Sequence, residues 1–205
     1  MRISNRFEKH IVAAATVAMS AAAAHASVVN WNCNVVVPYS QSGKYLNVET
    51  QVYGEFRNQV PGWDINVYGI ESANLRWWPG PDVADLTRRG YASGLGQGGT
   101  SVGVASLSAG TVVGAASSFN SYVSSVTQGG WMLNAANYFG FFFVASDNLV
   151  HYGFGVMTIG ENMGVRTLTS VSYESVAETS ITVVPAPGAL ALLGLAGIAT
   201  RRRRS

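Results

Sequence analysis

Apolar and polar side chains alternate with a period of two along several segments of this chain, the pattern of β-strands with one buried face. Residues 45–53 alternate in this way, and residues 139–145 are apolar on both faces, which predicts a central strand. The segments 149–159 and 166–174 continue the series, and the loop 160–164 between them, with glycine at both ends, predicts a hairpin. The first alternating series is Val29, Trp31, Cys33, Val35 and Val37.

Helical patterning is missing from the middle of the chain, because no window of about a dozen residues there shows the 3.6-residue period of a helix. Residues 27–184 hold 20 of the 23 glycines. Glycine at this density weakens helices and supplies the turns of all-β domains. We therefore predict an all-β fold with a single β-sandwich, jelly-roll or lectin-like, over residues 27–184. A closed barrel is the alternative.

The first 26 residues have the pattern of a secretory signal peptide. An uncharged run over residues 11–24 follows a basic start, and the small residues Ala24 and Ala26 fit a cleavage site that leaves Ser27 as the mature N-terminus. An uncleaved anchor is the other interpretation, but the run is short for a membrane span of about 20 residues. The basic start consists of Arg2, Arg6 and Lys9.

The last 21 residues, 185–205, form a second sorting segment. Prolines end the preceding strand. The apolar run 188–199 suits a hydrophobic sorting helix that enters the membrane transiently, and the terminal arginines are expected to stay on the cytoplasmic side. We expect this tail to be removed after sorting, as the hydrophobic tail of a GPI-anchor signal is. The motif and the basic cluster are Val184, Pro185, Ala186, Pro187, Arg201, Arg202, Arg203 and Arg204.

This tail resembles the PEP-CTERM sorting signal of exported bacterial proteins, with Ala186 where the family usually has glutamate. The resemblance implies recognition by a membrane exosortase after signal peptidase has acted. It also implies a destination at the cell surface or outside the cell, in association with exopolysaccharide, and membrane association before the tail is processed. Residues 61–66 and 137–141 also look like blocks of exported proteins of this family, which implies one surface domain and no catalytic activity.

The charge distribution argues against a nucleic-acid partner. Of the thirteen basic residues, seven lie in the two terminal segments, together with one of the eleven acidic residues. The middle is left with six basic and ten acidic residues, so it lacks the basic surface that phosphates require. Residues 90–146 carry no charge. This stretch predicts either small-residue strands joined by turns or a neutral face suited to uncharged glycans, so a neutral polysaccharide is the expected ligand.

Catalytic and metal chemistry finds little support in the sequence. The middle has one histidine, His151, and one cysteine, Cys33, which excludes a Cys/His zinc site and a disulfide scaffold. We expect His151 to make a structural hydrogen bond. Asp64, Asp82 and Asp85 could hold calcium through oxygen ligands, but solvated loop acids and turn caps are the favoured interpretation. We predict no cofactor, no metal and no catalytic residues.

Tryptophans supply the candidate glycan contacts. Trp77 and Trp78 are adjacent, so on a strand one points inward and the other outward. An exposed aromatic ring can stack on a sugar, and Trp63 is a third candidate. Packing in the core is the alternative for all three.

The sequence thus predicts a non-catalytic exported protein of the cell surface or extracellular matrix. A carbohydrate-binding module is the alternative. A secreted glycan-active hydrolase is a further alternative, and it would require two carboxylates facing one sugar.

Overall fold

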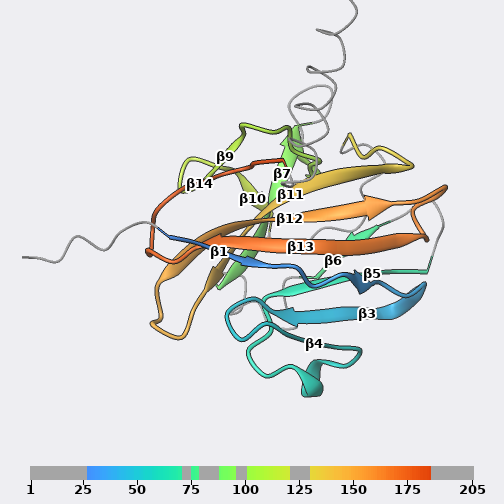
Figure 1. Ribbon diagram of the computed structural model, residues 1–205, viewed down its shortest axis with the longest axis horizontal. Helices are drawn as coiled ribbons and strands as arrows, with labels where there is room; N and C mark the ends of the chain where they lie inside the picture. Colours follow the sequence, from blue (N-terminus) through green and yellow to red (C-terminus); the bar gives the residue numbers. More distant parts are fainter. Residues whose placement is uncertain (1–26, 71–74, 79–87, 96–100, 121–129, 186–205) are drawn as a thin grey trace, which may run out of the picture.

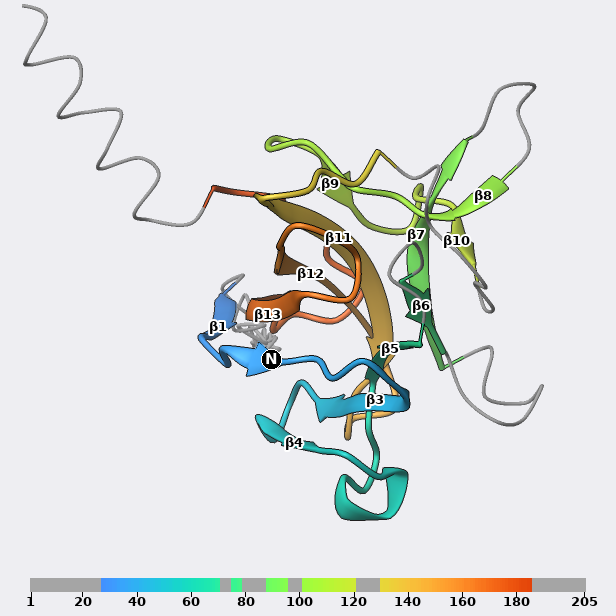
Figure 2. The same ribbon diagram turned by 90° about the vertical axis from the view of Figure 1, so that its right-hand side faces the viewer.

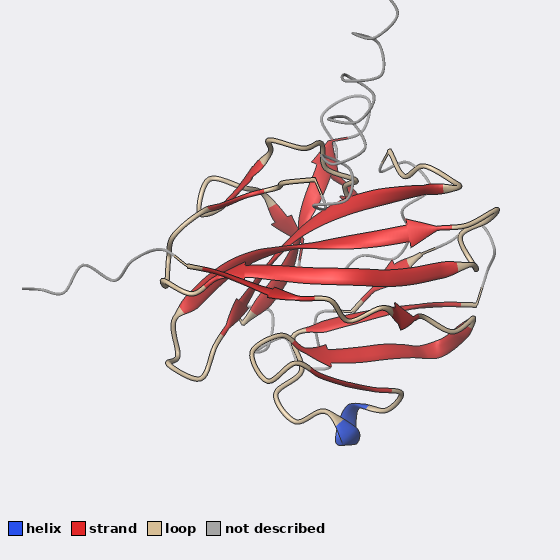
Figure 3. Ribbon diagram, in the orientation of Figure 1, coloured by secondary structure: helices blue, strands red, loops and turns tan. Residues whose placement is uncertain are grey.

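The computed structural model describes residues 27–70, 75–78, 88–95, 101–120 and 130–185. All strand pairs in these ranges are antiparallel, and the only helical element in them is a 3-10 turn, η1 (Arg57–Gln59) (Figure 3). The strands are β1 (Val28–Trp31), β2 (Val35–Val36), β3 (Ser40–Asn47), β4 (Val52–Gly54), β5 (Ile65–Gly69), β6 (Arg76–Trp77), β7 (Arg89–Leu95), β8 (Ser101–Val104), β9 (Val112–Val113), β10 (Phe119–Asn120), β11 (Ala135–Val144), β12 (Val150–Ile159), β13 (Arg166–Glu174) and β14 (Ile181–Thr182).

Two main sheets organise these strands (Figure 1). The larger sheet has the order β1-β13-β12-β11-β7-β10, with β2 also paired to β13 and β8 to β7. The smaller sheet has the order β4-β3-β5-β6, and β9 and β14 form a separate two-stranded ribbon. The fold is therefore mostly β and antiparallel, and β11 is a central strand of the larger sheet.

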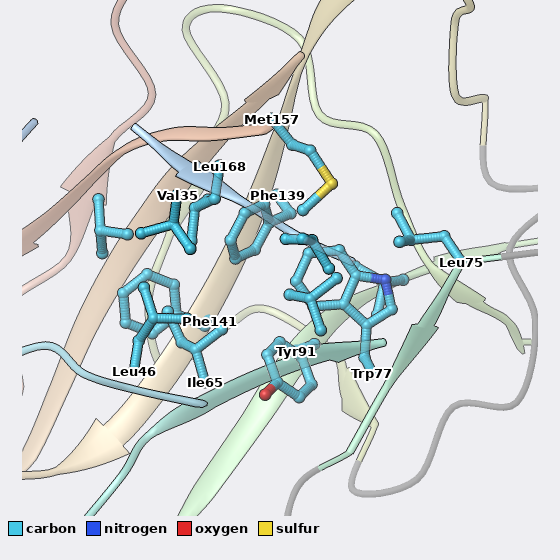
Figure 4. Packing of buried hydrophobic residues seen from close by; sticks show 14 of the residues in the cluster. Val35, Leu46, Ile65, Leu75, Trp77, Tyr91, Phe139, Phe141, Met157 and Leu168 are labelled. Carbon is cyan, nitrogen blue, oxygen red and sulfur yellow. The ribbon is translucent and has the colours of Figure 1, made fainter. Parts of the chain in front are cut away.

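The main hydrophobic core lies between the two sheets and draws buried residues from both. From the smaller sheet, Leu46, Ile65 and Trp77 are fully buried. They meet the inward face of β11, where the ring of Phe139 packs against Trp77 and Phe141 belongs to the same cluster (Figure 4). Burial of aromatic and aliphatic surface on this scale supplies most of the driving force for folding.

Glycines on β12 make room for the phenyl rings of β11. Gly155 pairs with Phe139, and Gly153 pairs with Phe141, in the antiparallel register. A Cβ atom at Gly155 would lie 2.2 Å from Cζ of Phe139, and one at Gly153 would lie 2.3 Å from Cζ of Phe141. These glycines let the rings lie flat across the neighbouring strand.

A second core covers the opposite face of the larger sheet. Tyr152, Phe154 and Val156 point outward from β12 and pack beneath the β9–β14 ribbon, which contributes Val113 and Ile181. Figure 2 shows this ribbon and the smaller sheet on opposite sides of β11, β12 and β13. Both faces of the central strands are thus buried, as the apolar sequence of residues 139–145 predicts.

Two strand predictions need correction. The alternation over residues 29–37 is not one strand, because it breaks after Trp31 and resumes at Val35, with Asn34 at φ +48°. The alternation over residues 45–53 is also interrupted: β3 ends at Asn47, and a turn with Gln51 at φ +58° precedes β4. Asparagine tolerates a positive φ better than most residues do. The alternation of apolar and polar residues continues through such a turn, so the sequence pattern does not reveal the break.

The terminal segments fall largely outside the described residues, including the predicted cleavage site at Ala24 and Ala26, the sorting residues Ala186 and Pro187, and the arginine cluster. Val184 and Pro185 are described; Val184 is exposed and follows the last strand. Within the described ranges, no helix has the length and apolar character needed to cross a membrane.

Candidate functional site

A polar pocket of about 450 Å³ opens where the ends of the two sheets meet. The smaller sheet contributes the end of β3 with the turn after it, and the start of β5. The larger sheet contributes the start of β7 and the end of β11. The lining residues are Asn47, Glu49, Thr50, Gly62, Asp64, Arg88, Arg89, Val144, Ala145 and Ser146.

Asp64 forms the inner wall of this pocket and is only 6% exposed. It immediately precedes β5; its backbone N–H donates to the carbonyl of Leu46 (2.7 Å), and its carboxylate Oδ2 accepts the N–H of Val48 (2.8 Å). Burial raises the pKa of the Asp64 carboxyl to about 7, although the Val48 N–H and the charge of Arg89 act in the opposite direction. No described residue donates a hydrogen bond to Oδ1.

Arg89 is a buried cation of the same pocket. Its guanidinium carbon lies 4.2 Å from the ring centroid of Trp63, a cation–π contact that fixes the group in place. The residue is 9% exposed, and its Nε atom is buried without a hydrogen-bond partner. Among the residues that the structure describes, no carboxylate or carbonyl accepts from this guanidinium. Its guanidinium thus lines the pocket without an acceptor from the described residues.

Glu49 occupies the pocket rim and is held by Ser146. Its Oε1 accepts the Ser146 hydroxyl (2.5 Å), and its Oε2 accepts the Ser146 N–H (3.0 Å). This pair links the turn after β3 to the turn after β11, so it ties the two sheets together at the pocket mouth. Arg88 is exposed at the same rim.

Asn47 supports the pocket floor with all its polar atoms engaged. Its Nδ2 donates to the carbonyls of Pro61 and Gly62, and its Oδ1 accepts the N–H of Thr50. The pocket thus combines a rigid floor with two kinds of open group, guanidinium donors at Arg89 and a carboxyl oxygen at Asp64. Paired donors and acceptors of this kind suit a ligand rich in hydroxyl groups.

The three candidate tryptophans lie in different environments. Trp77 is fully buried in the main core, and Trp63 is 4% exposed beneath Arg89. Trp78 is half-buried, with its ring 5.9 Å from that of Trp63 and 6.4 Å from that of Tyr45. Of these three rings, Trp78 alone offers substantial exposed surface for stacking on a sugar.

The remaining candidates have structural contacts. His151 is buried, with Nδ1 2.8 Å from the carbonyl oxygen of Glu174 and Nε2 3.1 Å from Oδ2 of Asp147, in accord with the predicted structural role. Cys33 is half-buried, and its thiol donates to the Leu168 carbonyl (3.2 Å). Asp82 and Asp85, considered for calcium, lie outside the described residues, and the described ranges contain no cluster of His, Cys, Asp or Glu suited to a metal.

No protein-family model matches the sequence, and no curated protein or solved structure is significantly similar to it.

The stability of the domain should depend on pH through Asp64. Its pKa of about 7 in the folded state exceeds the ordinary value of 3.8, so the folded state binds more protons between these two values. The contribution of Asp64 to stability should then be fully present below about pH 4 and be lost as the pH rises through 7. Urea unfolding of the wild type and Asp64→Asn at pH 5 and pH 8 checks this, because Asn keeps an acceptor for the Val48 N–H. Equal pH dependence in the two proteins would contradict the assignment to Asp64.

Proposed function

We propose that this chain is a non-catalytic exported protein of the cell surface or extracellular matrix, delivered by its N-terminal segment and sorted by a PEP-CTERM-like tail. The support for this proposal is the packing of Val183, just before the sorting motif. The Val183 N–H donates to the carbonyl of Thr111, its carbonyl accepts the N–H of Gly110, and its side chain is buried. Val184 is exposed. Within the part of the chain that the structure describes, the last packed residue thus directly precedes the sorting motif, which suits a tail that an exosortase can reach.

Removing residues 185–205 should leave the fold intact and change its destination. Neither described core contains a residue beyond Val183, so the melting temperature of the truncated protein should match that of the untruncated one. The truncated protein should be released from the cell in soluble form. Calorimetry and fractionation of cells and medium check both statements. A large loss of stability would show that the tail belongs to the domain.

We further propose that the domain is a β-sandwich of jelly-roll or lectin-like type, whose pocket binds a neutral polysaccharide. Two carboxyl groups and two guanidinium groups line the pocket, so acidic and basic side chains are equal in number, and their charges balance above pH 7, where Asp64 is ionised. Sugar hydroxyls both donate and accept, and can therefore pair with Asp64 and with Arg89. Arg89 has no acceptor among the described residues, which is costly for a buried guanidinium, and a ligand hydroxyl that accepts from its terminal nitrogens would relieve that cost.

A glycan array probed with residues 27–184 should return neutral saccharides. Arg89→Lys and Arg88→Gln should each weaken binding of the best saccharide by about tenfold or more, the scale of one lost hydrogen bond to a charged group. Arg57→Gln serves as the matched control, because Arg57 is an exposed arginine of η1 outside the pocket. Loss of binding in Trp78→Ala, with the arginine variants unchanged, would move the site to the tryptophan surface.

Glycan hydrolysis is a second candidate function, favoured by one observation. A protonated acid beside a second carboxylate is the arrangement that glycoside hydrolysis uses, and Asp64, with its pKa raised to about 7, shares a pocket with Glu49. Both oxygens of Glu49 are already bonded to Ser146, which favours binding over catalysis. Release of reducing ends by the wild type, but not by Asp64→Asn, would establish hydrolysis. Binding without release supports the non-catalytic proposal.

A further inference from the structure

Glu174, the last residue of β13, is a buried carboxylate that neither proposed activity uses. The residue is 3% exposed. Its Oε1 accepts two backbone N–H groups, from Ser27 at 2.9 Å and from Val176 at 3.0 Å. His151 contacts the backbone carbonyl of Glu174 and not its carboxylate.

The carboxylate of Glu174 has no cationic partner in the part of the chain that the structure describes. The ion pairs there join Lys44 to Glu55 and His151 to Asp147. A buried carboxylate served only by neutral amides is stabilised much less than one that faces a positive charge. The Ser27 nitrogen is therefore the group whose charge state matters most for Glu174.

Ser27 is also the residue that signal-peptide cleavage would expose. We propose that cleavage after Ala26 turns the Ser27 amide nitrogen into a charged terminus that forms an ion pair with Glu174, so that maturation itself completes the fold. Hydrolysis adds water across the Ala26–Ser27 bond. The carbonyl carbon of Ala26 takes the hydroxyl, and the nitrogen of Ser27 takes the hydrogen and then a proton from solvent to become an ammonium group. This inference rests on the proposed cleavage site.

The backbone already holds that nitrogen in place. The Ser27 carbonyl accepts the N–H of Ser175 (3.0 Å), and Val28 pairs directly with Glu174 in the antiparallel register of β1 and β13. The N–O distance of 2.9 Å falls in the range of charge-assisted hydrogen bonds. An α-amino group is mostly protonated near neutral pH. The new charge thus arises within hydrogen-bond distance of the carboxylate, and no strand has to move.

The ion pair would make the domain more stable after cleavage of the leader than before it. Before cleavage, β1 closes the edge of the larger sheet with Glu174 uncompensated, so the domain is less stable while the leader is attached. After cleavage, the ion pair secures β1 on β13. A chain that is least stable before leader removal is easier to export unfolded, and it becomes most stable at its destination.

The test uses the chain from Ser27 to Ser205 in detergent, released from a cleavable fusion so that it begins with a free amino group. The comparison protein is the same chain with an acetylated Ser27, which keeps the N–H but removes the charge. The free form should melt about 3–8 °C higher, the scale expected for one charge-assisted bond in a domain of this size. Glu174→Gln should abolish the difference between the two forms.

Equal melting temperatures of the free and acetylated forms would overturn the proposal, as would a difference that persists in Glu174→Gln. A chain that begins at Ala26 provides a second test that needs no substitution at Glu174. It places the ammonium group one residue away and should melt close to the acetylated form; melting with the free Ser27 form would contradict the ion pair. N-terminal sequencing of exported protein tests the cleavage site separately, so failure of one claim is distinguishable from failure of the other.

Discussion

Replacing Trp77 with alanine is expected to lower the free energy of unfolding by about 3–5 kcal/mol, the cost of emptying a large, fully packed core position. The indole ring is fully buried, with its centroid 4.4 Å from the ring of Phe139 and 5.1 Å from that of Tyr91. It belongs to β6 of the smaller sheet, and these partners belong to the larger one. The substitution therefore removes packing between the sheets as well as within them.

Trp78→Ala is the matched control for this prediction, because it deletes the same side chain at the next position of the chain, just after β6. Trp78 is half-buried beside Tyr45 and Trp63, so its loss should cost clearly less stability. Urea unfolding of the two variants measures both. Equal losses would show that the two rings are not segregated between core and surface as the structure has them.

Replacing Arg166 with methionine should cost about 2–4 kcal/mol, because it leaves buried carbonyl groups without donors. The Arg166 guanidinium donates to the carbonyls of Met163 (2.9 Å), Pro38 (3.0 Å) and Gly69 (2.8 Å), and burial lowers its pKa to about 10. Gly69 ends β5, so these bonds join the larger sheet to the smaller one. Methionine fills a similar volume but donates nothing.

Two variants separate the hydrogen bonds of Arg166 from its packing. Arg166→Lys keeps the charge but cannot reach three carbonyls at once, so it should recover only part of the lost stability. Arg57→Met removes an exposed arginine and should change stability little. Thermal unfolding of the three proteins provides the comparison. A stability of Arg166→Met equal to that of the wild type would show that these carbonyls find other donors.

The strands of the hairpin are the part of the fold that the sequence predicts best. The segment predicted over residues 166–174 agrees with β13, and the loop 160–164 joins it to β12 as expected. Both strands are rich in apolar residues, and glycines mark the turn. The alternation of β13 shifts by one residue between Leu168 and Val171, where a register shift interrupts its pairing with β12. The breaks near Asn34 and Gln51 could not be predicted in this way. A turn that adds an even number of residues leaves the alternation of apolar and polar side chains in phase, so the sequence reads as one continuous strand.

The pocket is much harder to predict from the sequence, since its walls come from four segments that are distant along the chain. No local motif joins Glu49 or Asp64 to Ser146. One signal was present: Arg88 and Arg89 are the only adjacent pair of basic residues between residues 27 and 184, and they directly precede the uncharged stretch. The burial of Trp63 depends on Arg89, a partner 26 positions away, which strand alternation cannot reveal.

We propose above that the polar pocket between the sheet ends binds a neutral saccharide. Titration of isotope-labelled residues 27–184 with such a saccharide, followed by amide NMR, tests it most directly. We expect the largest chemical-shift changes at the amides of Gly62, Ala145 and Ser146, which line the pocket, and smaller changes in Arg89→Lys at the same saccharide concentration. Binding only of charged glycans, or shifts centred on the Trp78 indole with the pocket amides unmoved, would contradict it.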